Sequence, residues 1–148
     1  MADDTTLIAN LIAGYAELVD LGDFDGVADL LRDAGVGDGE TSPLLRGRDA
    51  LAAMFTATTR RYADGTPRTK HVTTNLILEI DLDTARASAR SYWMVLQAVE
   101  GLPLQPILAG RYHDEFERSQ GTWRFAERRY FIDLVGNVSR HMLSHLPT

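Results

Sequence analysis

The chain has 148 residues, of which 45% are hydrophobic and 24% charged, a composition typical of a globular protein with a core in one domain, residues 1–148. Its net charge of -6 argues against a nucleic-acid-binding surface, and the absence of cysteine excludes disulfides, thiolate catalysis and cysteine-ligated zinc. No apolar run approaches the roughly 20 residues of a membrane helix, and the acidic start MADD does not resemble a signal peptide, so we expect a cytoplasmic protein without a membrane partner.

Helical periodicity characterises the first 62 residues. Residues 5–21 place apolar side chains at i, i+3 and i+4 spacing, and Gly22 is expected to end this helix. The same kind of spacing predicts a shorter helix over residues 24–33 and a third over residues 48–62. Residues 34–43 (AGVGDGETSP) are rich in Gly and Asp and are interpreted as a turn.

Strand-type segments follow after residue 66, separated by turn signals that favour antiparallel hairpins. They cover residues 68–80, 84–98, 105–118 and 122–135, and residues 139–146 (SRHMLSHL) are expected to form a short final helix. Helices first and long antiparallel strands afterwards indicate an α+β fold. We expect a cone-shaped, curved, mostly antiparallel sheet (an α+β barrel) covered by three N-terminal helices. Such a cone encloses a pocket suited to a small, mostly apolar ligand.

His71 begins the strand RTKHVTTNLILEID, residues 68–81. Strict alternation of side chains places His71 on the face opposite to the apolar Leu78 and Ile80, where it would meet solvent. A sheet covered on both faces, or a β-bulge, would reverse this assignment. His71 is therefore interpreted either as a surface histidine or as part of a pocket wall.

Asp20 and Arg128 also have two interpretations each. Asp20 lies near the end of the first helix, on a side of small alanines, and is either an exposed acid or packed against a neighbouring element. A carboxylate is disfavoured at the C-terminal end of a helix, which hints at a functional role. Arg128 and Arg129 are consecutive in a strand and diverge, so one of them can reach a pocket, while surface salt bridges with residues 114–118 (DEFER) are the alternative.

The sequence offers little for a metal or a cofactor. His141 and His145 are spaced i, i+4, but no acid accompanies them, and they are interpreted as a helix face and not as a metal site. The glycines of GVGDGE lack the context of a nucleotide-binding fingerprint. We therefore expect no metal and no cofactor.

Taken together, the segments resemble the SnoaL-like branch of the nuclear-transport-factor-2-like superfamily, over about residues 5–135. The resemblance is carried by the order and spacing of IANLIAGYAELVDLGDFDGVADLL, GRDALAAMF, KHVTTNLILEID and GRYHDEFERSQGTWRFAERR. It implies a cone-shaped α+β barrel with a deep apolar pocket, usually in an oligomer.

The resemblance also implies a catalytic pair. In enzymes of this family, such as scytalone dehydratase and hexachlorocyclohexane dehydrochlorinase, an aspartate near the end of the first helix pairs with a histidine of the first long strand. The matching positions are Asp20 in LVDLGD and His71 in KHVTTN, and Arg128 matches an arginine of the dehydrochlorinase that assists the leaving group. The dehydrochlorinase has a lysine where this chain has Ala16, which puts dehalogenation in doubt.

We therefore expect a cofactor-independent lyase or isomerase of dehydratase, isomerase or cyclase type. Its substrate would be a small hydrophobic molecule such as a polyketide, terpenoid or steroid, with His71 as the base assisted by Asp20. The alternatives are a non-catalytic small-molecule-binding module and an accessory small subunit of an oxygenase. We expect a homo-oligomer, a dimer or a trimer, that covers an apolar outer sheet face. The residues expected to line the pocket are Tyr15, Phe55, Asn75, Tyr92, Met94, Leu108 and Tyr112.

Overall fold

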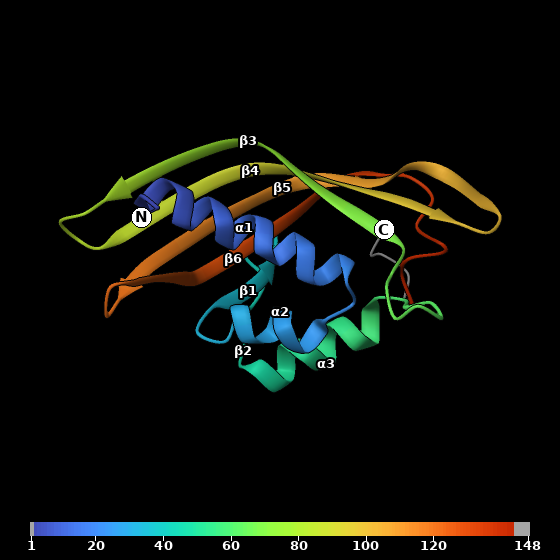
Figure 1. Ribbon diagram of the computed structural model, residues 1–148, viewed down its shortest axis with the longest axis horizontal. Helices are drawn as coiled ribbons and strands as arrows, with labels where there is room; N and C mark the ends of the chain where they lie inside the picture. The colour runs from blue at the N-terminus through green and yellow to red at the C-terminus, as the bar shows by residue number, and fades with distance from the viewer. Residues whose placement is uncertain (1, 144–148) are drawn as a thin grey trace.

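A computed structural model describes residues 2–143 as three helices and a six-stranded sheet (Figure 1). In chain order the elements are α1 (Asp4–Asp20), α2 (Phe24–Leu30), β1 (Gly35–Asp38), β2 (Leu45–Arg46), α3 (Arg48–Thr58), β3 (Thr69–Asp81), β4 (Arg86–Val99), β5 (Leu102–Ser119) and β6 (Thr122–Val135). The three predicted N-terminal helices and the four long strands are confirmed, with boundaries that differ by a few residues.

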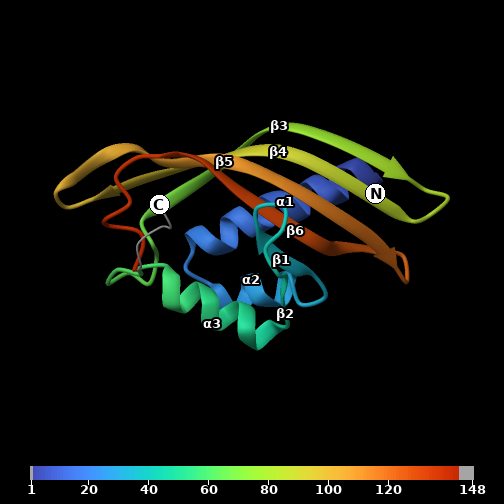
Figure 2. The ribbon, with the colours of Figure 1, turned by 180° about the vertical axis from the view of Figure 1, so that it is seen from behind.

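The sheet has the strand order β2-β1-β6-β5-β4-β3. Its neighbouring strands are antiparallel except for β1 and β6, which pair in parallel. The long strands β3 to β6 curve, and the three helices lie on the concave side, as Figures 1 and 2 show from opposite directions. This is the α+β fold expected from the sequence. Within the described part of the chain, no helix combines the length and apolar character needed to cross a membrane.

The end of α1 fixes the position of Asp20, the last residue of that helix. Gly22 adopts a left-handed φ of 73°, which costs glycine little. The Gly22 N–H donates to the Val19 carbonyl at 2.9 Å, and the Asp23 N–H donates to the Leu18 carbonyl at 3.0 Å. This pair of bonds is the Schellman motif, which confirms Gly22 as the predicted end of the helix.

A β-bulge interrupts β3. Its register against β4 shifts between Thr74 and Ile77, so that two residues, Asn75 and Leu76, oppose a single residue of β4. Asn75 adopts a φ of 54°, a left-handed conformation that asparagine tolerates better than most residues. The extra residue shifts the side-chain alternation of β3 by one position.

The bulge places both halves of β3 on the same side of the sheet. Before it, His71 pairs with the buried Val95, and after it Leu78 pairs with the buried Ala89. His71 and Leu78 therefore both face the concave side. The interpretation of His71 as a surface residue, which assumed strict alternation, is wrong, and the bulge is the reason.

Apolar side chains fill the concave side in two clusters. The larger cluster packs the helices and β1 against one end of the sheet and is centred on Ile8, Val27, Leu31, Leu51, Phe116 and Phe125. The smaller cluster lies at the other end and consists of Trp93, Val95, Leu102, Ile107, Leu108 and Tyr112. Tyr15 and Tyr130 pack against both clusters, which places them at the boundary between the two.

Two segments differ from the expectation. Residues 34–43, interpreted as a turn, contain β1, which pairs with β6 and buries Val36. The final helix predicted for residues 139–146 is not formed over residues 139–143, which contain a turn and a β-bridge between Met142 and Thr59. The rest of that predicted helix, with His145, lies outside the described residues.

Candidate active site

The Asp20 carboxylate has three hydrogen-bond contacts with the start of β3, two with His71 and one with Thr69. The His71 Nδ1 lies 2.6 Å from Asp20 Oδ1, the His71 backbone N–H donates to Oδ2 at 2.8 Å, and the Thr69 hydroxyl donates to Oδ1 at 2.8 Å. The side chains of Asp20 and His71 are only 9% and 11% exposed. The start of β3 thus holds both the carboxylate and the ring in one fixed geometry.

The hydrogen-bonding partners of the pair decide the tautomer of His71. An ionised carboxylate can only accept hydrogen bonds, so Nδ1 of a neutral His71 carries the proton. The other ring nitrogen, Nε2, then carries a lone pair. His71 lines a cavity on the concave side of the sheet, where we expect this nitrogen to meet a ligand.

The surroundings of Asp20 keep its carboxylate ionised. Burial acts to raise the pKa of Asp20, but the ring and backbone N–H of His71 and the Thr69 hydroxyl together lower it below its ordinary value. The Oδ1 atom of this carboxylate lies 2.6 Å from Nδ1 of His71. The pair can therefore accept a proton at Nε2 and stabilise the imidazolium that results.

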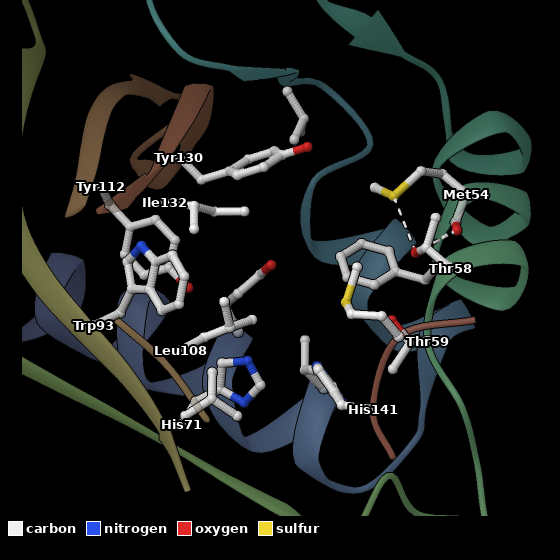
Figure 3. A pocket seen from close by; sticks show the side chains of 16 residues that line it. Met54, Thr58, Thr59, His71, Trp93, Leu108, Tyr112, Tyr130, Ile132 and His141 are labelled. Carbon is white, nitrogen blue, oxygen red and sulfur yellow. Dashed lines mark hydrogen bonds between the residues drawn. The ribbon is translucent and has the colours of Figure 1, made fainter. Parts of the chain in front are cut away.

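A cavity of about 140 Å³ lies next to His71, at the boundary of the two apolar clusters (Figure 3). Four of the residues predicted to line a pocket do line this cavity, namely Tyr15, Phe55, Leu108 and Tyr112. Burial raises the pKa of Tyr112 well above its ordinary value, so its hydroxyl is a neutral hydrogen-bond donor. The cavity is apolar with a few polar groups, as is typical of small-molecule sites.

Trp93 forms one wall of the cavity and depends on a glycine of β5. Trp93 pairs with Gly110, and a Cβ atom at Gly110 would lie 2.6 Å from Cζ2 of the indole. The indole Nε1–H donates to the Arg111 carbonyl at 3.0 Å, and the ring stacks on Tyr112. Glycine at position 110 therefore lets the indole lie close to the sheet.

Arg128 is buried but does not line the cavity. It donates two hydrogen bonds to Asp114, at 2.8 and 2.9 Å, and its guanidinium lies over the rings of Tyr15 and Tyr112. Burial opposes the charge of Arg128, but the contact with Asp114 outweighs this and raises its pKa. The predicted partner strand DEFER does supply the acid, in the interior and not at the surface. Arg128 thus packs against Tyr15 and Tyr112 of the cavity wall without lining the cavity itself.

Three residues predicted to line the pocket lie elsewhere. Asn75 is exposed at the bulge. Tyr92 is 54% exposed, and Tyr92 and Met94 lie on the outer face of β4 because Trp93 and Val95 take the inward positions. The prediction for all three was wrong because it did not assign faces to β4 and did not locate the bulge.

His141 is a cavity residue that the sequence reasoning missed. It is 5% exposed and reaches the cavity from the segment after β6. The i, i+4 spacing of His141 and His145 raised only the question of a metal site. The position of His141 at the cavity depends on tertiary contacts, which this spacing does not reveal. The presence of histidine after the last strand was the signal that the sequence offered.

Among residues 2–143, no three His, Asp or Glu side chains converge as metal ligands would.

Comparison with known proteins gives a family and a fold. The sequence profile of the SnoaL-like domain matches residues 1–129. A Mycobacterium tuberculosis protein of unknown function, solved as an aspartate-to-asparagine variant, is 26% identical over 89% of this chain and 73% of its own, with a TM-score of 0.70. A search among curated proteins found no significant match.

Two structures from Novosphingobium aromaticivorans are also similar. One is an NTF2-like protein with a cystatin-like fold, 23% identical over 93% of this chain and 86% of its own, with a TM-score of 0.68. The other, whose description proposes a scytalone dehydratase, is 20% identical over 88% of this chain and 85% of its own, with a TM-score of 0.67. At these identities the likeness shows the NTF2-like fold.

Proposed function

The chain belongs to the SnoaL-like domain family, and on this premise we propose that it is a cofactor-independent lyase or isomerase that removes a proton from carbon in a small cyclic substrate. The observation that carries the proposal is the buried pair of Asp20 and His71, with Nδ1 and Oδ1 2.6 Å apart, at the wall of an apolar cavity. A histidine held by a carboxylate is suited to general-base catalysis.

The proposed reaction begins with proton abstraction next to a carbonyl group. His71 takes the proton at Nε2, and the electron pair of the broken C–H bond moves into the carbonyl to form an enolate. Asp20 stabilises the imidazolium through its contact with Nδ1. A general base placed in this way contributes roughly 10²- to 10⁴-fold to the rate.

The enolate then has two outcomes, neither of which needs a redox partner. In an elimination, a hydroxyl group on the β-carbon leaves and takes the proton from His71, so the products are an unsaturated ketone and water. In an isomerisation, His71 returns the proton to a different carbon. The apolar walls exclude water, which strengthens the interaction between Asp20 and the imidazolium.

The size of the cavity suggests a substrate of about one ring. Its volume of about 140 Å³ is close to the ~150 Å³ of an apolar cavity that binds benzene. The aromatic walls formed by Tyr15, Phe55 and Trp93 favour a flat, apolar ligand. Within the expected substrate classes, this favours a single-ring compound or one ring of a larger molecule.

An elimination assay tests the proposal without knowledge of the natural substrate. A panel of single-ring β-hydroxyketones, beginning with 3-hydroxycyclohexanone, would be incubated with the protein, and the conjugated ketone would be followed by its ultraviolet absorbance. We expect turnover by the wild type, the buffer rate for H71A, and unchanged turnover for H113A, because His113 follows the inward-facing Tyr112 in β5 and packs on Phe131. Circular dichroism would check that both variants fold.

A binding module is the competing function, and the same experiment separates the two. If ligands that occupy the cavity in NMR titrations all react at the buffer rate, the lyase or isomerase proposal is wrong and binding alone remains. An accessory role beside an oxygenase would show as co-purification with a larger subunit.

A further inference from the structure

His141 is a second imidazole in the cavity, and the proposed mechanism does not use it. The residue is 5% exposed, and its Nδ1 has no hydrogen-bond partner among residues 2–143. Both His71 and His141 line the cavity, and in the view of Figure 3 their rings lie at the same end of it. A buried polar atom without a partner costs about 1–3 kcal/mol, so its presence calls for an explanation.

The main chain holds His141 in place, so that its ring lines the cavity. The Arg60 N–H donates to the His141 carbonyl at 2.8 Å, and the His141 N–H donates to the Val138 carbonyl at 3.0 Å. The next residue, Met142, forms a β-bridge with Thr59 just after α3. The position of the ring is thus set by backbone contacts on both sides.

The charge state of His141 suits a hydrogen-bond donor. Burial and the nearby His71 lower the pKa of His141 to about 4, so the ring is neutral at pH 7. A neutral imidazole carries one N–H and does not compete with His71 for the proton. Such a ring can polarise a carbonyl group by hydrogen bonding alone.

We propose that His141 binds the oxygen of the substrate, by donating a hydrogen bond from its ring N–H to the carbonyl of a ring-sized ketone whose α-carbon faces His71. The class of ligand rests on the proposed function. When His71 removes the proton, negative charge develops on this oxygen, and the hydrogen bond from His141 strengthens. The two imidazoles then divide the work, one as the base and the other as the group that holds the enolate oxygen.

Two other polar groups of the cavity are less suited to this task. The Thr58 hydroxyl already donates to the Met54 carbonyl at 2.9 Å. Tyr130 lies at the opposite end of the cavity from His71 in the view of Figure 3. The ring of His141, at the same end of the cavity as His71 in Figure 3, is therefore favoured over these two groups.

Infrared spectroscopy of bound 2-cyclohexenone tests the proposal directly. A donated hydrogen bond lowers the carbonyl stretching frequency of the ligand. We expect a lower frequency in the wild type than in H141L, and a return toward the wild-type frequency in H141N or H141Q, because either amide can supply an N–H in place of that of the ring. We also expect H141L to bind 2-cyclohexenone about tenfold more weakly, the value of one hydrogen bond, and to bind 1-methylcyclohexene, which lacks the oxygen, as the wild type does.

The outcomes separate this proposal from the proposed function. Equal carbonyl frequencies in the wild type and H141L would show that His141 only fills the cavity wall, even if the wild type catalyses proton abstraction. A frequency shift that depends on His141, in a protein that abstracts no proton, would support the binding role and contradict the catalytic one. If H141L does not fold, the comparison of the wild type with H141M, which also lacks a donor, decides.

Discussion

At the scale of the residue, Asp20 occupies a position that is unfavourable for a carboxylate. It is the last residue of α1, where the helix dipole disfavours negative charge. Two N–H groups of His71 and the Thr69 hydroxyl compensate, all from the first three residues of β3. These hydrogen bonds join the end of α1 to the start of β3. The role of Thr69 could not be predicted from the sequence because it depends on this contact between the two elements.

His141 makes the stability of the protein sensitive to acid. Its pKa is lowered from 6.5 to about 4 in the fold, so unfolding takes up a proton below pH 6.5 and stability falls with falling pH. Between pH 7 and pH 4 we expect the wild type to lose about 3 kcal/mol more than H141L, from the difference in pKa. Urea unfolding at the two pH values measures this loss, and an equal loss in both proteins would contradict the neutral, buried state of His141.

The residue types of the site could be predicted from the sequence better than their orientations. The resemblance to the family pointed to Asp20 and His71, and the structure brings them together. The resemblance gave no basis for placing His141 in the cavity. That position follows from backbone contacts between the segment after β6 and residues 58–60. The resemblance also matched Arg128 to a residue near the leaving group, whereas Asp114 holds Arg128 behind the aromatic wall.

At the scale of the element, the bulge in β3 determines whether His71 faces the cavity. Asn75 is exposed and has a φ of 54°, so its contribution is to the backbone. We expect N75V to destabilise the fold by about 1–2 kcal/mol, because a β-branched residue is strained at this φ, and N75G to leave the stability nearly unchanged. Denaturant unfolding compares the two. Equal stabilities would mean that the bulge does not require a left-handed residue.

The elements that could not be predicted depend on partners distant in sequence. The four long strands have strong β-type sequences and clear turn signals, and they were predicted. The short strand β1 contains two glycines in four residues, which is unfavourable for a strand, and it forms because β6 pairs with it in parallel. The bulge in β3 carries no glycine, so alternation was assumed to continue through it.

At the scale of the whole molecule, Arg128 and Asp114 form a buried ion pair that joins β5 to β6 and supports the cavity wall. We expect R128M or D114L alone to destabilise the protein by about 3–5 kcal/mol, because each leaves an uncompensated buried charge. The double variant should lose much less than the sum of the two. A double-mutant cycle by urea unfolding measures the coupling, and additive losses would contradict a direct interaction.

The outer face of the sheet carries exposed apolar side chains, which are relevant to the expected homo-oligomer. It exposes Tyr92 and Leu134, which are 54% and 69% exposed. A homo-oligomer that covers this face stays a prediction. The catalytic proposal does not depend on it, since the carboxylate, both imidazoles and the cavity walls described here all come from one chain.

The most direct test of the account is deuterium exchange at the α-carbon of a ring ketone, followed by NMR in heavy water. The assay reports proton abstraction alone and needs no leaving group. We expect the wild type to accelerate exchange of 2-cyclohexenone or cyclohexanone above the buffer rate. D20N, which keeps the shape of the side chain but lacks the charge, should lose roughly 10²- to 10⁴-fold of that acceleration, or all that is measurable. Exchange by folded D20N at the wild-type rate, or a bound ketone that exchanges no faster than in buffer, would contradict the central claim that Asp20 and His71 act as a base.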